Sequence, residues 1–374
     1  MPQAHIWTGT ALPPAAMAVL EGLATVSLSR VGERNDWYAE ASTADAIIVA
    51  GETFVTGEVM DRIGPRLRVI ARPGIGVDRI DLDAATRRGI MVVNTPDGPT
   101  ESTAEHTIAL LLNLCKQVMT GDRILRTGHP FPTLAELVPG LEAAGAVLGL
   151  VGLGRIGSRV ADIARVLGMK VLAFDPFITP ERASMLGVEL VPSLAELLPR
   201  AQVVSLHCPS TPETRHIMNA GTLSLMPRGS YLINAARGAL IDEAALLDAL
   251  RSGHLAGAAL DVYDPEPPVT NHPLFTHPNT ICTPHIGSYT TASVVRMRVM
   301  VCEQIASVLR GEHPTNLVNT AVQAIWSSGP PGRASSPAAS GFQGIKPIPW
   351  RSQISIISSD CCADIRSDSR EARL

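Results

Sequence analysis

Ala146-Val-Leu-Gly-Leu-Val-Gly-Leu-Gly-Arg-Ile-Gly157 is the stretch of the sequence that decides the fold. Its first six residues are apolar or glycine throughout, as in a strand that is buried on both faces of a parallel sheet. Glycines follow at Gly152, Gly154 and Gly157, and apolar residues then recur from 156 to 167 at the three- and four-residue spacing of a helix. A strand, a glycine-rich turn and a helix in this order are typical of the dinucleotide-binding unit of a Rossmann fold.

Each part of this motif has a physical reason. Gly152 permits the tight turn, Gly154 lets the backbone approach a pyrophosphate, and Gly157 lets the helix pack closely on the strand. The helix presents unpaired N–H groups and a positive dipole end to the phosphates. The next apolar strand is followed by Asp175, whose carboxylate can accept hydrogen bonds from the adenosine ribose and would repel a 2′-phosphate. We therefore expect NAD as the cofactor, with NADP disfavoured; the alternative is that Asp175 is only a turn residue.

Strand-like and helix-like segments alternate along most of the chain, which predicts an α/β protein with parallel sheets. Before the motif, strands are expected at 5–7, 46–50, 67–71 and 89–94, with helices at 14–23, 56–63 and 102–119. After it, strands are expected at 170–174, 202–206, 230–234, 256–261 and 280–283, with helices at 243–252 and 290–310. Beyond about residue 320 the sequence becomes rich in Gly, Pro and Ser and shows no sustained period, so we expect a disordered tail.

The composition restricts the function classes. A chain of 374 residues that is 45% hydrophobic can form two domains. A net charge of −4 gives no strong attraction to nucleic acid or to an anionic membrane. We expect no membrane span and no secretory signal, because the chain has neither a run of roughly 20 apolar residues nor a basic segment before an apolar run at its start. None of the six cysteines forms a CxxC pair, so we expect reduced thiols, no metal site and a cytoplasmic location.

Three later segments carry residues with catalytic chemistry, and each falls just past the carboxyl end of an expected strand. They contain Arg237, Glu266 and His285, in the ranges 233–240, 259–268 and 283–288. Open α/β sheets place their ligands at this edge. Reduction of a 2-oxo acid needs a cation that holds the carboxylate and an acid that protonates the carbonyl oxygen as hydride reaches carbon.

The residue types suit these two tasks. Arg237 stays charged and can bind a carboxylate in a forked geometry. His285 can exchange a proton because imidazole titrates at about pH 6.5, and a nearby Glu266 would hold one ring nitrogen and favour the protonated ring. Taken singly, each residue has an ordinary alternative: a cap or salt bridge for Arg237, a solvated loop acid for Glu266, and a turn histidine for His285. Further histidines are also candidates, at positions 106, 207, 216, 254, 272 and 277.

Seven motifs between about residues 46 and 319 are specific when taken together. They are Arg72-Pro-Gly-Ile-Gly-Val-Asp78, Val93-Asn-Thr-Pro96, Ala104-Glu-His106, Val151-Gly-Leu-Gly-Arg-Ile-Gly157, Leu206-His-Cys-Pro209, Asn234-Ala-Ala-Arg-Gly238 and Thr283-Pro-His-Ile-Gly287. On these motifs the sequence resembles the D-isomer-specific 2-hydroxyacid dehydrogenases, which include phosphoglycerate dehydrogenases and glyoxylate/hydroxypyruvate reductases. The resemblance implies an NAD-dependent oxidoreductase that transfers a hydride between nicotinamide and C2 of a small 2-hydroxy or 2-oxo acid.

The resemblance also implies roles for individual residues. Arg237, Glu266 and His285 would be the catalytic set, and the N–H groups of Ile75 and Gly76 would hold the substrate carboxylate together with Arg237. The cofactor would contact the glycine turn and the ends of the later strands, at Gly152, Gly154, Arg155, Ile156, Gly157, Asp175, Pro209, Ala235, Ala236, Asp261 and Gly287.

Two Rossmann-like or flavodoxin-like parallel-sheet domains, with the active site in the cleft between them, are the implied architecture. The substrate (catalytic) domain would be discontinuous, comprising residues 1–103 and 291–320, and the NAD-binding domain would comprise residues 104–290. Residues 321–374 would be a disordered tail. The usual assembly of such enzymes is a homodimer built on the nucleotide domain.

Several points stay open. Residues 49–54 lack the basic residue that some phosphoglycerate dehydrogenases carry there, which is a mild argument against a phosphorylated substrate, although Arg72 could serve instead. Residues 127–139 depart from the usual arm sequence, which leaves the dimer contact open. The chain could also be an NAD-sensing co-repressor with little turnover, or an enzyme for a one-carbon or phosphite donor, where formate-oxidising relatives usually carry Gln in place of Glu266. The side chain of the acid and the direction of the reaction are not predicted.

Overall fold

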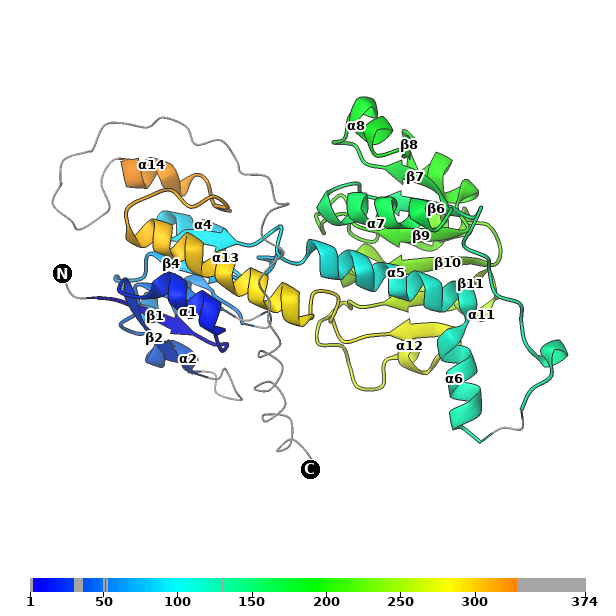
Figure 1. Cartoon of the computed structure of the whole chain (residues 1–374), viewed down its shortest axis with the longest axis horizontal. Helices are drawn as coiled ribbons and strands as arrows, with labels where there is room; N and C mark the ends of the chain where they lie inside the picture. Colours follow the sequence, from blue (N-terminus) through cyan, green and yellow to red (C-terminus); the bar gives the residue numbers. More distant parts are fainter. Residues whose placement is uncertain (1–2, 30–35, 50, 52, 129–130, 328–374) are drawn as a thin grey trace. The chain divides into compact units, whose positions relative to one another are not determined.

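The computed structural model describes residues 3–29, 36–49, 51, 53–128 and 131–327, and the strands in these ranges form two parallel sheets (Figure 1). The first sheet has the strand order β2-β1-β3-β4-β5. Its strands are β1 (Ala4–Thr8), β2 (Ala24–Leu28), β3 (Ala46–Ile48), β4 (Val69–Arg72) and β5 (Met91–Asn94). The helices of this part are α1 (Pro14–Leu20), α2 (Trp37–Glu40), α3 (Gly57–Ile63), α4 (Leu82–Arg87), α13 (Thr291–Leu309) and α14 (Val322–Ser327).

Apolar residues cover both faces of the first sheet, because successive side chains of a strand point to opposite faces. Ile47 belongs to a core cluster that includes Trp7 and Ile70, whereas its neighbour Ile48 belongs to a second cluster that includes Val301 and Ile305 of α13. Helix α13 also contacts α1, β4 and β5. A helix from the far end of the sequence therefore completes the core of the first sheet.

The second sheet has the strand order β12-β11-β10-β9-β6-β7-β8. Its strands are β6 (Val147–Val151), β7 (Lys170–Phe174), β8 (Glu189–Leu190), β9 (Val203–Leu206), β10 (Ser230–Asn234), β11 (Leu255–Leu260) and β12 (Thr280–Cys282). The order reverses beside β6, and such a switch point is where open α/β sheets bind ligands.

The helices of the second part connect these strands. They are α5 (Thr100–Lys116), α6 (Val118–Arg126), α7 (Arg155–Val166), α8 (Pro180–Met185), α9 (Leu194–Leu197), α10 (Ala220–Ser224), α11 (Glu243–Arg251) and α12 (Pro273–Thr276), with 3₁₀ turns at Leu134–Glu136, Leu198–Arg200 and Gly238–Leu240. Among the described residues, no helix combines the length and the apolar character that a membrane span needs.

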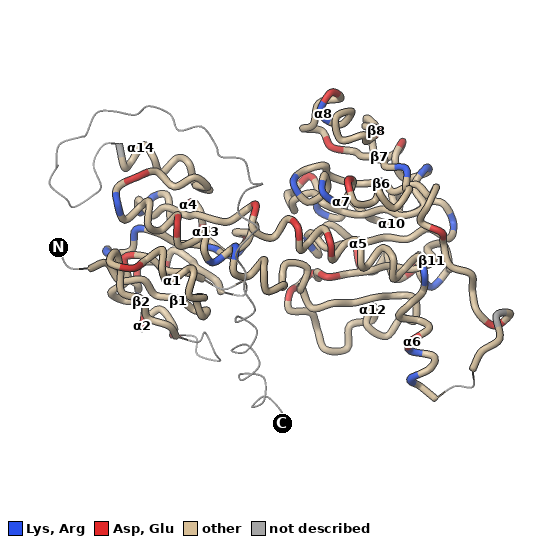
Figure 2. Tube along the Cα trace, viewed as in Figure 1, with Lys and Arg blue, Asp and Glu red and all other residues tan. Residues whose placement is uncertain are grey.

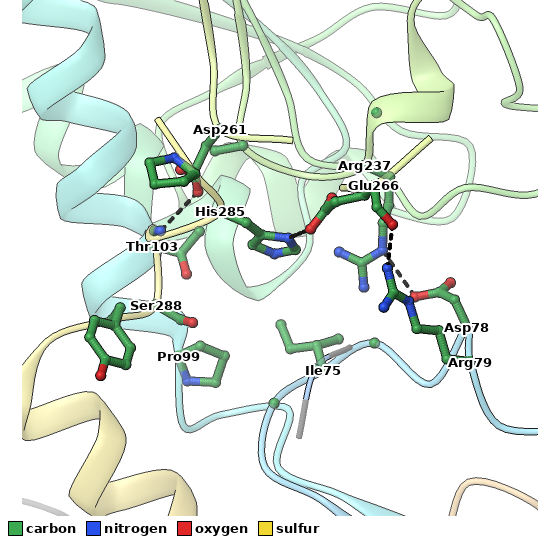
Figure 3. Close-up of a pocket in the computed structure, with 18 of the residues that line it drawn as sticks. Ile75, Asp78, Arg79, Pro99, Thr103, Arg237, Asp261, Glu266, His285 and Ser288 are labelled. Carbon is green, nitrogen blue, oxygen red and sulfur yellow. Dashed lines mark hydrogen bonds and ion pairs between the residues drawn. The ribbon is translucent and has the colours of Figure 1, made fainter. Parts of the chain in front are cut away.

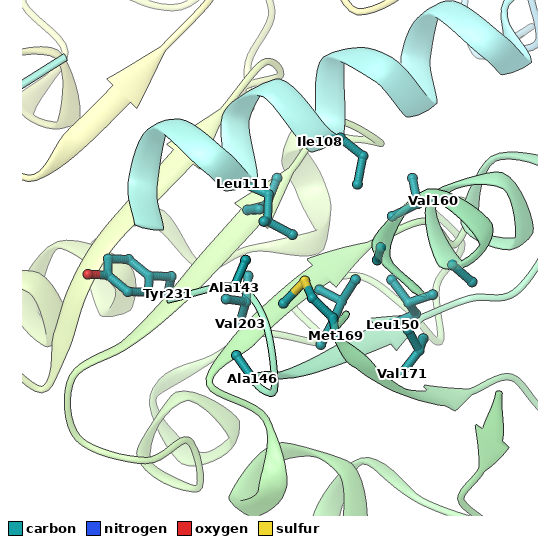
Figure 4. Close-up of a cluster of buried hydrophobic side chains, with 14 of the residues drawn as sticks. Ile108, Leu111, Ala143, Ala146, Leu150, Val160, Met169, Val171, Val203 and Tyr231 are labelled. Atoms are coloured by element: carbon teal, nitrogen blue, oxygen red, sulfur yellow. The ribbon is translucent and has the colours of Figure 1, made fainter. Parts of the chain in front are cut away.

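Helices α5 and α7 pack together over the second sheet (Figure 4). Ile108 and Leu111 of α5 share a buried cluster with Leu150 of β6 and Val160 of α7. Charged residues of both signs are interspersed along the chain (Figure 2). Two of them, Arg159 of α7 and Glu101 of α5, form an ion pair of 2.8 Å beside the same helix contact. Helix α7, which follows the glycine motif, therefore contacts α5 through a buried apolar cluster on one side and an ion pair on the other.

Two expectations from the sequence need correction. The helix predicted at 102–119 ends at Lys116, because Gln117 has a left-handed backbone with a φ of 53°, and α6 starts after it. Residues 322–327, predicted as part of a disordered tail, form α14: Val322 is fully buried, and Nε1 of Trp326 donates a hydrogen bond to the carbonyl oxygen of Gly89 at 2.9 Å. The rest of that tail lies outside the described residues.

Candidate active site

A cavity of about 1170 Å³ lies at the carboxyl ends of strands from both sheets (Figure 3). The loops after β1, β3 and β4 line it from the first sheet, including Thr10, Thr53 and residues 72–80. The loops after β10, β11 and β12 line it from the second sheet, with residues between 235 and 239, between 261 and 268, and between 282 and 289. This is the edge at which parallel α/β sheets place their ligands.

His285 and Glu266 are hydrogen-bonded to each other in this cavity. Nδ1 of His285 lies 2.5 Å from Oε1 of Glu266 (Figure 3). Because the carboxylate occupies Nδ1, Nε2 is the ring nitrogen that remains for a ligand. The side chain of His285 is 47% exposed, so a molecule in the cavity can reach it.

The carboxylate of Glu266 is held in its ionised form. Burial opposes ionisation and raises its pKa, but the hydrogen bond and charge of His285 act in the opposite direction. The backbone N–H of Tyr263 and the charge of Arg79 add to this effect, so the pKa of Glu266 lies below its usual value. A carboxylate in this state supports a positive charge on the neighbouring imidazole.

The backbone of His285 is left-handed, with a φ of 54°, which costs free energy in a residue other than glycine. Asp261, buried directly after β11, holds the segment on both sides of it. Oδ1 of Asp261 accepts hydrogen bonds from the hydroxyl of Thr283 at 2.6 Å and from the N–H of Ile286 at 2.9 Å. Oδ2 accepts one from the N–H of Gly287 at 2.8 Å. Asp261 therefore fixes the direction in which His285 points.

Asp261 also stays ionised despite its burial. Burial raises its pKa, but hydrogen bonds from His106, Thr283, Ile286 and Gly287 together outweigh this and lower the pKa below its usual value. Nε2 of His106 lies 3.5 Å from Oδ1. A carboxylate offers about four acceptor positions, so most of those of Asp261 are occupied by the protein itself.

Arg237, directly after β10, lies beside two backbone N–H groups. Its Nε donates a hydrogen bond to Oδ2 of Asp78 at 3.1 Å, and its Nη1 donates one to the carbonyl oxygen of Ala236 at 2.7 Å. A Cβ atom on Gly76 would clash with Nη2, so the guanidinium lies against this glycine. Within the described residues, the N–H groups of Ile75 and Gly76 donate no hydrogen bond. A cation and two available donors therefore face the same part of the cavity.

The loop after β4 is joined to both loops that carry these groups. Asp78 binds Arg237, and Nη2 of Arg79 donates a hydrogen bond to the carbonyl oxygen of Glu266 at 2.7 Å. The guanidinium of Arg79 also lies 4.8 Å from the centre of the Phe54 ring. Asp78 and Arg79 were not predicted as site residues, since their partners lie more than 150 residues away in the chain.

Two other candidate histidines, His272 and His207, do not line the cavity. Nε2 of His272 lies 2.7 Å from Oε2 of Glu243, but neither residue lines the cavity. His207 is buried, and burial lowers its pKa to about 4, so its ring is neutral at ordinary pH. Its Nε2 lies 3.0 Å from the hydroxyl of Ser205. A histidine–carboxylate pair alone therefore does not identify the site; its position at the cavity does.

The glycine turn has the geometry that a dinucleotide requires. Gly152 has a φ of 99°, and a Cβ atom there would lie 2.8 Å from the backbone of Cys208. A Cβ atom on Gly157 would clash with the carbonyl oxygen of Gly152, whereas one on Gly154 would meet no atom within 4 Å. Gly154 precedes α7, and within the described part of the chain no side chain caps that helix end. Open space and uncapped N–H groups at the start of α7 suit a phosphate group.

Asp175 lies next to this turn at the end of β7. Its Oδ2 accepts a hydrogen bond from the N–H of Leu153 at 2.7 Å, and its Oδ1 accepts one from the N–H of Phe177 at 2.9 Å. Each oxygen retains a further acceptor position, which ribose hydroxyls can use. The turn and the acid therefore fit an adenine dinucleotide.

Comparisons with known proteins agree with this geometry. Residues 108–287 match the family model described as "D-isomer specific 2-hydroxyacid dehydrogenase, NAD binding domain". The chain is 40% identical over 304 residues to the D-3-phosphoglycerate dehydrogenase of Methanocaldococcus jannaschii, which covers 81% of this chain and 57% of that protein. Among solved structures, the TT0316 protein of Thermus thermophilus superposes with a TM-score of 0.77 at 42% identity, covering 84% of this chain and 99% of that one. The chain belongs to the D-isomer specific 2-hydroxyacid dehydrogenase family.

A glyoxylate reductase from Paecilomyes thermophila has the same fold as this chain, with a TM-score of 0.75, 30% identity and coverage of 85% of this chain and 99% of that one. The matched segment includes the second sheet and the glycine turn, so this part of the chain is an NAD-binding domain and NAD(H) is its cofactor. The chain spans little more than half the length of the curated phosphoglycerate dehydrogenase that it matches.

The site residues predicted from the sequence fall into two groups in the structure. The first group lines the cavity: Ile75, Gly76, Ile156, Ala235, Arg237, Asp261, Glu266, His285 and Gly287. The second group does not line it, and lies at the glycine turn or at the ends of the neighbouring strands: Gly152, Gly154, Arg155, Gly157, Asp175, Pro209 and Ala236. Arg155 pairs with Asp97 at 2.5 Å. Since Ile156 belongs to α7 and lines the cavity, the two groups meet at the start of that helix.

Proposed function

We propose that the chain is an NAD-dependent oxidoreductase that transfers a hydride between nicotinamide and C2 of a 2-hydroxy or 2-oxo acid. One observation carries this proposal: the pair His285–Glu266, the cation Arg237 and the available N–H groups of Ile75 and Gly76 line the same cavity. The phosphoglycerate dehydrogenase and glyoxylate reductase names of its relatives support the same reaction class.

Arg237 and the loop after β4 bind the substrate carboxylate in this proposal. The guanidinium supplies charge-assisted hydrogen bonds, and the N–H groups of Ile75 and Gly76 add two neutral donors. Asp78 holds the guanidinium through Nε, which leaves Nη2 over Gly76 for the ligand. An acid fixed in this way presents C2 and its oxygen at a constant position relative to the second sheet.

His285 exchanges the proton on the C2 oxygen. During reduction, Nε2 donates its proton to the carbonyl oxygen while the hydride, which NADH supplies when bound, reaches carbon. During oxidation, the same nitrogen accepts the hydroxyl proton. Glu266 is the positioning residue on Nδ1: its ionised carboxylate stabilises the protonated ring and sets the orientation of Nε2.

Two further assignments belong to the proposal. Residues 1–103 and 291–320 form the substrate domain, and residues 104–290 form the NAD-binding domain; the packing of α13 on α1, β4 and β5 supports this division. Asp175 selects NAD over NADP, because its carboxylate at the ribose end of the site would repel a 2′-phosphate. A homodimer and a cytoplasmic location remain proposals as well.

The test is oxidation of NADH by the purified full chain with a panel of glyoxylate, hydroxypyruvate, pyruvate and phosphohydroxypyruvate. We expect absorbance at the NADH band to fall with at least one of the four acids. Binding of NADH without turnover of any of them would contradict the proposal and favour an NAD-sensing co-repressor. Formate and phosphite are tested as donors with NAD. Reduction of NAD by either would favour an enzyme for a one-carbon or phosphite donor instead.

A further inference from the structure

The cavity has a second polar region that the proposed reaction does not use. It lies at the carboxyl ends of β1, β3 and β4, which are neighbours in the first sheet. Thr10 follows β1, Thr53 follows β3, and Arg72 ends β4; Arg298, from α13, joins them. Nη2 of Arg298 donates a hydrogen bond to the hydroxyl of Thr10 at 2.6 Å.

Arg298 is half-buried. Among the described residues, the Thr10 hydroxyl is the only group that accepts a hydrogen bond from its guanidinium. None of the described carboxylates lies within ion-pair distance of its guanidinium, and burial lowers the pKa of this group. Each described acid that lines the cavity already has a partner. Asp78 is paired with Arg237, Asp264 with Arg215 and Glu266 with His285, and Asp261 accepts hydrogen bonds from the loop around His285. A partly desolvated charge of this kind is stabilised when an anion binds beside it.

Thr53 gives an independent indication of a ligand. Its side chain is 4% exposed, it lines the cavity, and its hydroxyl has no hydrogen-bond partner among the described residues. Three described side chains carry such an atom, and the other two, Trp7 and Ser230, do not line the cavity. Because a buried hydroxyl without a partner is unfavourable, this atom is placed for a polar group that enters the cavity.

Arg72 adds a second guanidinium to the same region. A Cβ atom on Gly51 would lie 3.1 Å from its Nη2, and one on Gly74 would lie 3.9 Å from its Cζ. The group therefore occupies the space that these two glycines leave open, between the loops after β3 and β4. Residues 49–54 carry no basic side chain, but Arg72 and Arg298 place two guanidinium groups along the cavity.

We propose that Arg298, Thr10 and Thr53, together with Arg72, form a second anion subsite that binds a phosphate or carboxylate at the far end of the 2-hydroxy acid. The inference rests on the proposed function, because it assumes that Arg237 and the loop after β4 hold the C1 carboxylate. The substrate class is then a 2-hydroxy or 2-oxo acid with a second anionic group. The phosphate and the carboxylate share this chemistry, and substrate pairs separate them.

The test compares kcat/KM for acids that differ by one anionic group. Phosphohydroxypyruvate is compared with hydroxypyruvate, and oxaloacetate with pyruvate, in wild type and in Arg298→Met, Arg298→Lys and Thr53→Val. Arg298→Met should lower the preference for the anionic member about 10- to 100-fold, because a charge-assisted hydrogen bond is lost. Thr53→Val should lower it about 3- to 10-fold, and Arg298→Lys should retain part of it. Arg296→Met is the matched control, since Arg296 lies on the same helix but not at the cavity.

The outcomes separate this inference from the reaction itself. A wild type that prefers neither acid with a second anionic group would overturn the subsite, as would a preference that stays unchanged in both Arg298→Met and Thr53→Val. NADH oxidation with pyruvate or hydroxypyruvate would still uphold the proposed function. Failure of wild type with every acid would contradict the proposed function instead. Preference for the phosphate member alone, or for the carboxylate member alone, supports the subsite and identifies its anion. Thermal melting and NADH binding show whether each variant is folded. If Arg298→Met does not fold, Arg298→Lys and Thr53→Val still test the subsite.

Discussion

Replacement of Gly76 by alanine tests whether the guanidinium of Arg237 holds the substrate carboxylate. A Cβ atom at this position would clash with Nη2 of Arg237 and would lie 2.7 Å from Oδ2 of Asp78. Both atoms end flexible side chains, and Gly76 is not among the glycines with a positive φ, so the backbone can accept alanine. We expect the free energy of unfolding to change by less than about 1 kcal/mol, while the guanidinium is displaced.

The expected effect on the 2-oxo acid is large. A charge-assisted hydrogen bond contributes about 1.5 to 3 kcal/mol, which corresponds to a rise in KM of about 10- to 150-fold. Because the side chain of Arg237 is 31% exposed, screening by solvent favours the lower half of this range. KM for NADH should change by less than about threefold, since the clash lies outside the glycine turn.

Steady-state NADH oxidation with the preferred acid measures both constants. Gly121→Ala is the matched control, because a Cβ atom at Gly121 would meet no atom within 4 Å. In the double variant with Arg237→Ala, the alanine at 76 should add little, since the group that it displaces is gone. An unchanged KM in Gly76→Ala, or effects of the two changes that add fully, would refute the assignment of Arg237 to the carboxylate.

Four further predictions concern other groups of the site. His285→Gln should lower kcat by about 10²- to 10⁴-fold because the proton donor is lost, and a variant that keeps a tenth of wild-type kcat would exclude this role; Glu266→Gln should have a smaller effect in the same assay. Asp261→Asn should lower the free energy of unfolding by about 1 to 3 kcal/mol at neutral pH. The pKa of Asp261 is lowered in the folded chain. Its contribution to the free energy of unfolding is therefore present above the ordinary carboxyl pKa of about 4 and is lost as pH falls through the lower folded value. Wild type should lose more stability on acidification than the variant. Urea unfolding at neutral and acidic pH measures this, and parallel losses would contradict it. Asp175→Ser should raise kcat/KM for NADPH relative to NADH by about tenfold or more, and an unchanged ratio would remove Asp175 from cofactor selection.

The parts of the fold that the sequence predicted well are those with a local cause. Apolar runs predicted the strand before Gly152 and helix α7. The spacing of the glycines predicted the turn between them, where a Cβ atom at Gly152 or Gly157 would clash with nearby backbone atoms. The helix expected at 243–252 is α11, and Oδ1 of Asp242, directly before it, accepts hydrogen bonds from the N–H groups of Ala244 and Ala245. Local patterns of this kind are readable because the interacting residues are a few positions apart.

The parts that the sequence did not predict depend on distant contacts or on short elements. The break after Lys116 occurs at Gln117, a residue without the turn preference of glycine. Strand β8 has two residues and lies at the edge of its sheet, so it is too short to show a period. Arg298 was unremarkable in the sequence because its hydrogen-bond partner, Thr10, is 288 positions away. Which side chains from the first sheet enter the cavity is therefore a result of the tertiary fold.

At position 285 the left-handed backbone favours a different residue from the one that the proposed reaction requires. Asparagine and glycine adopt this conformation more easily, by an amount on the order of 1 kcal/mol. A search for variants that survive heating, without regard to activity, should therefore recover substitutions of His285 that are more robust and inert. The proposed proton exchange by His285 therefore requires that heat-resistant variants keep this residue and gain stability elsewhere in the chain.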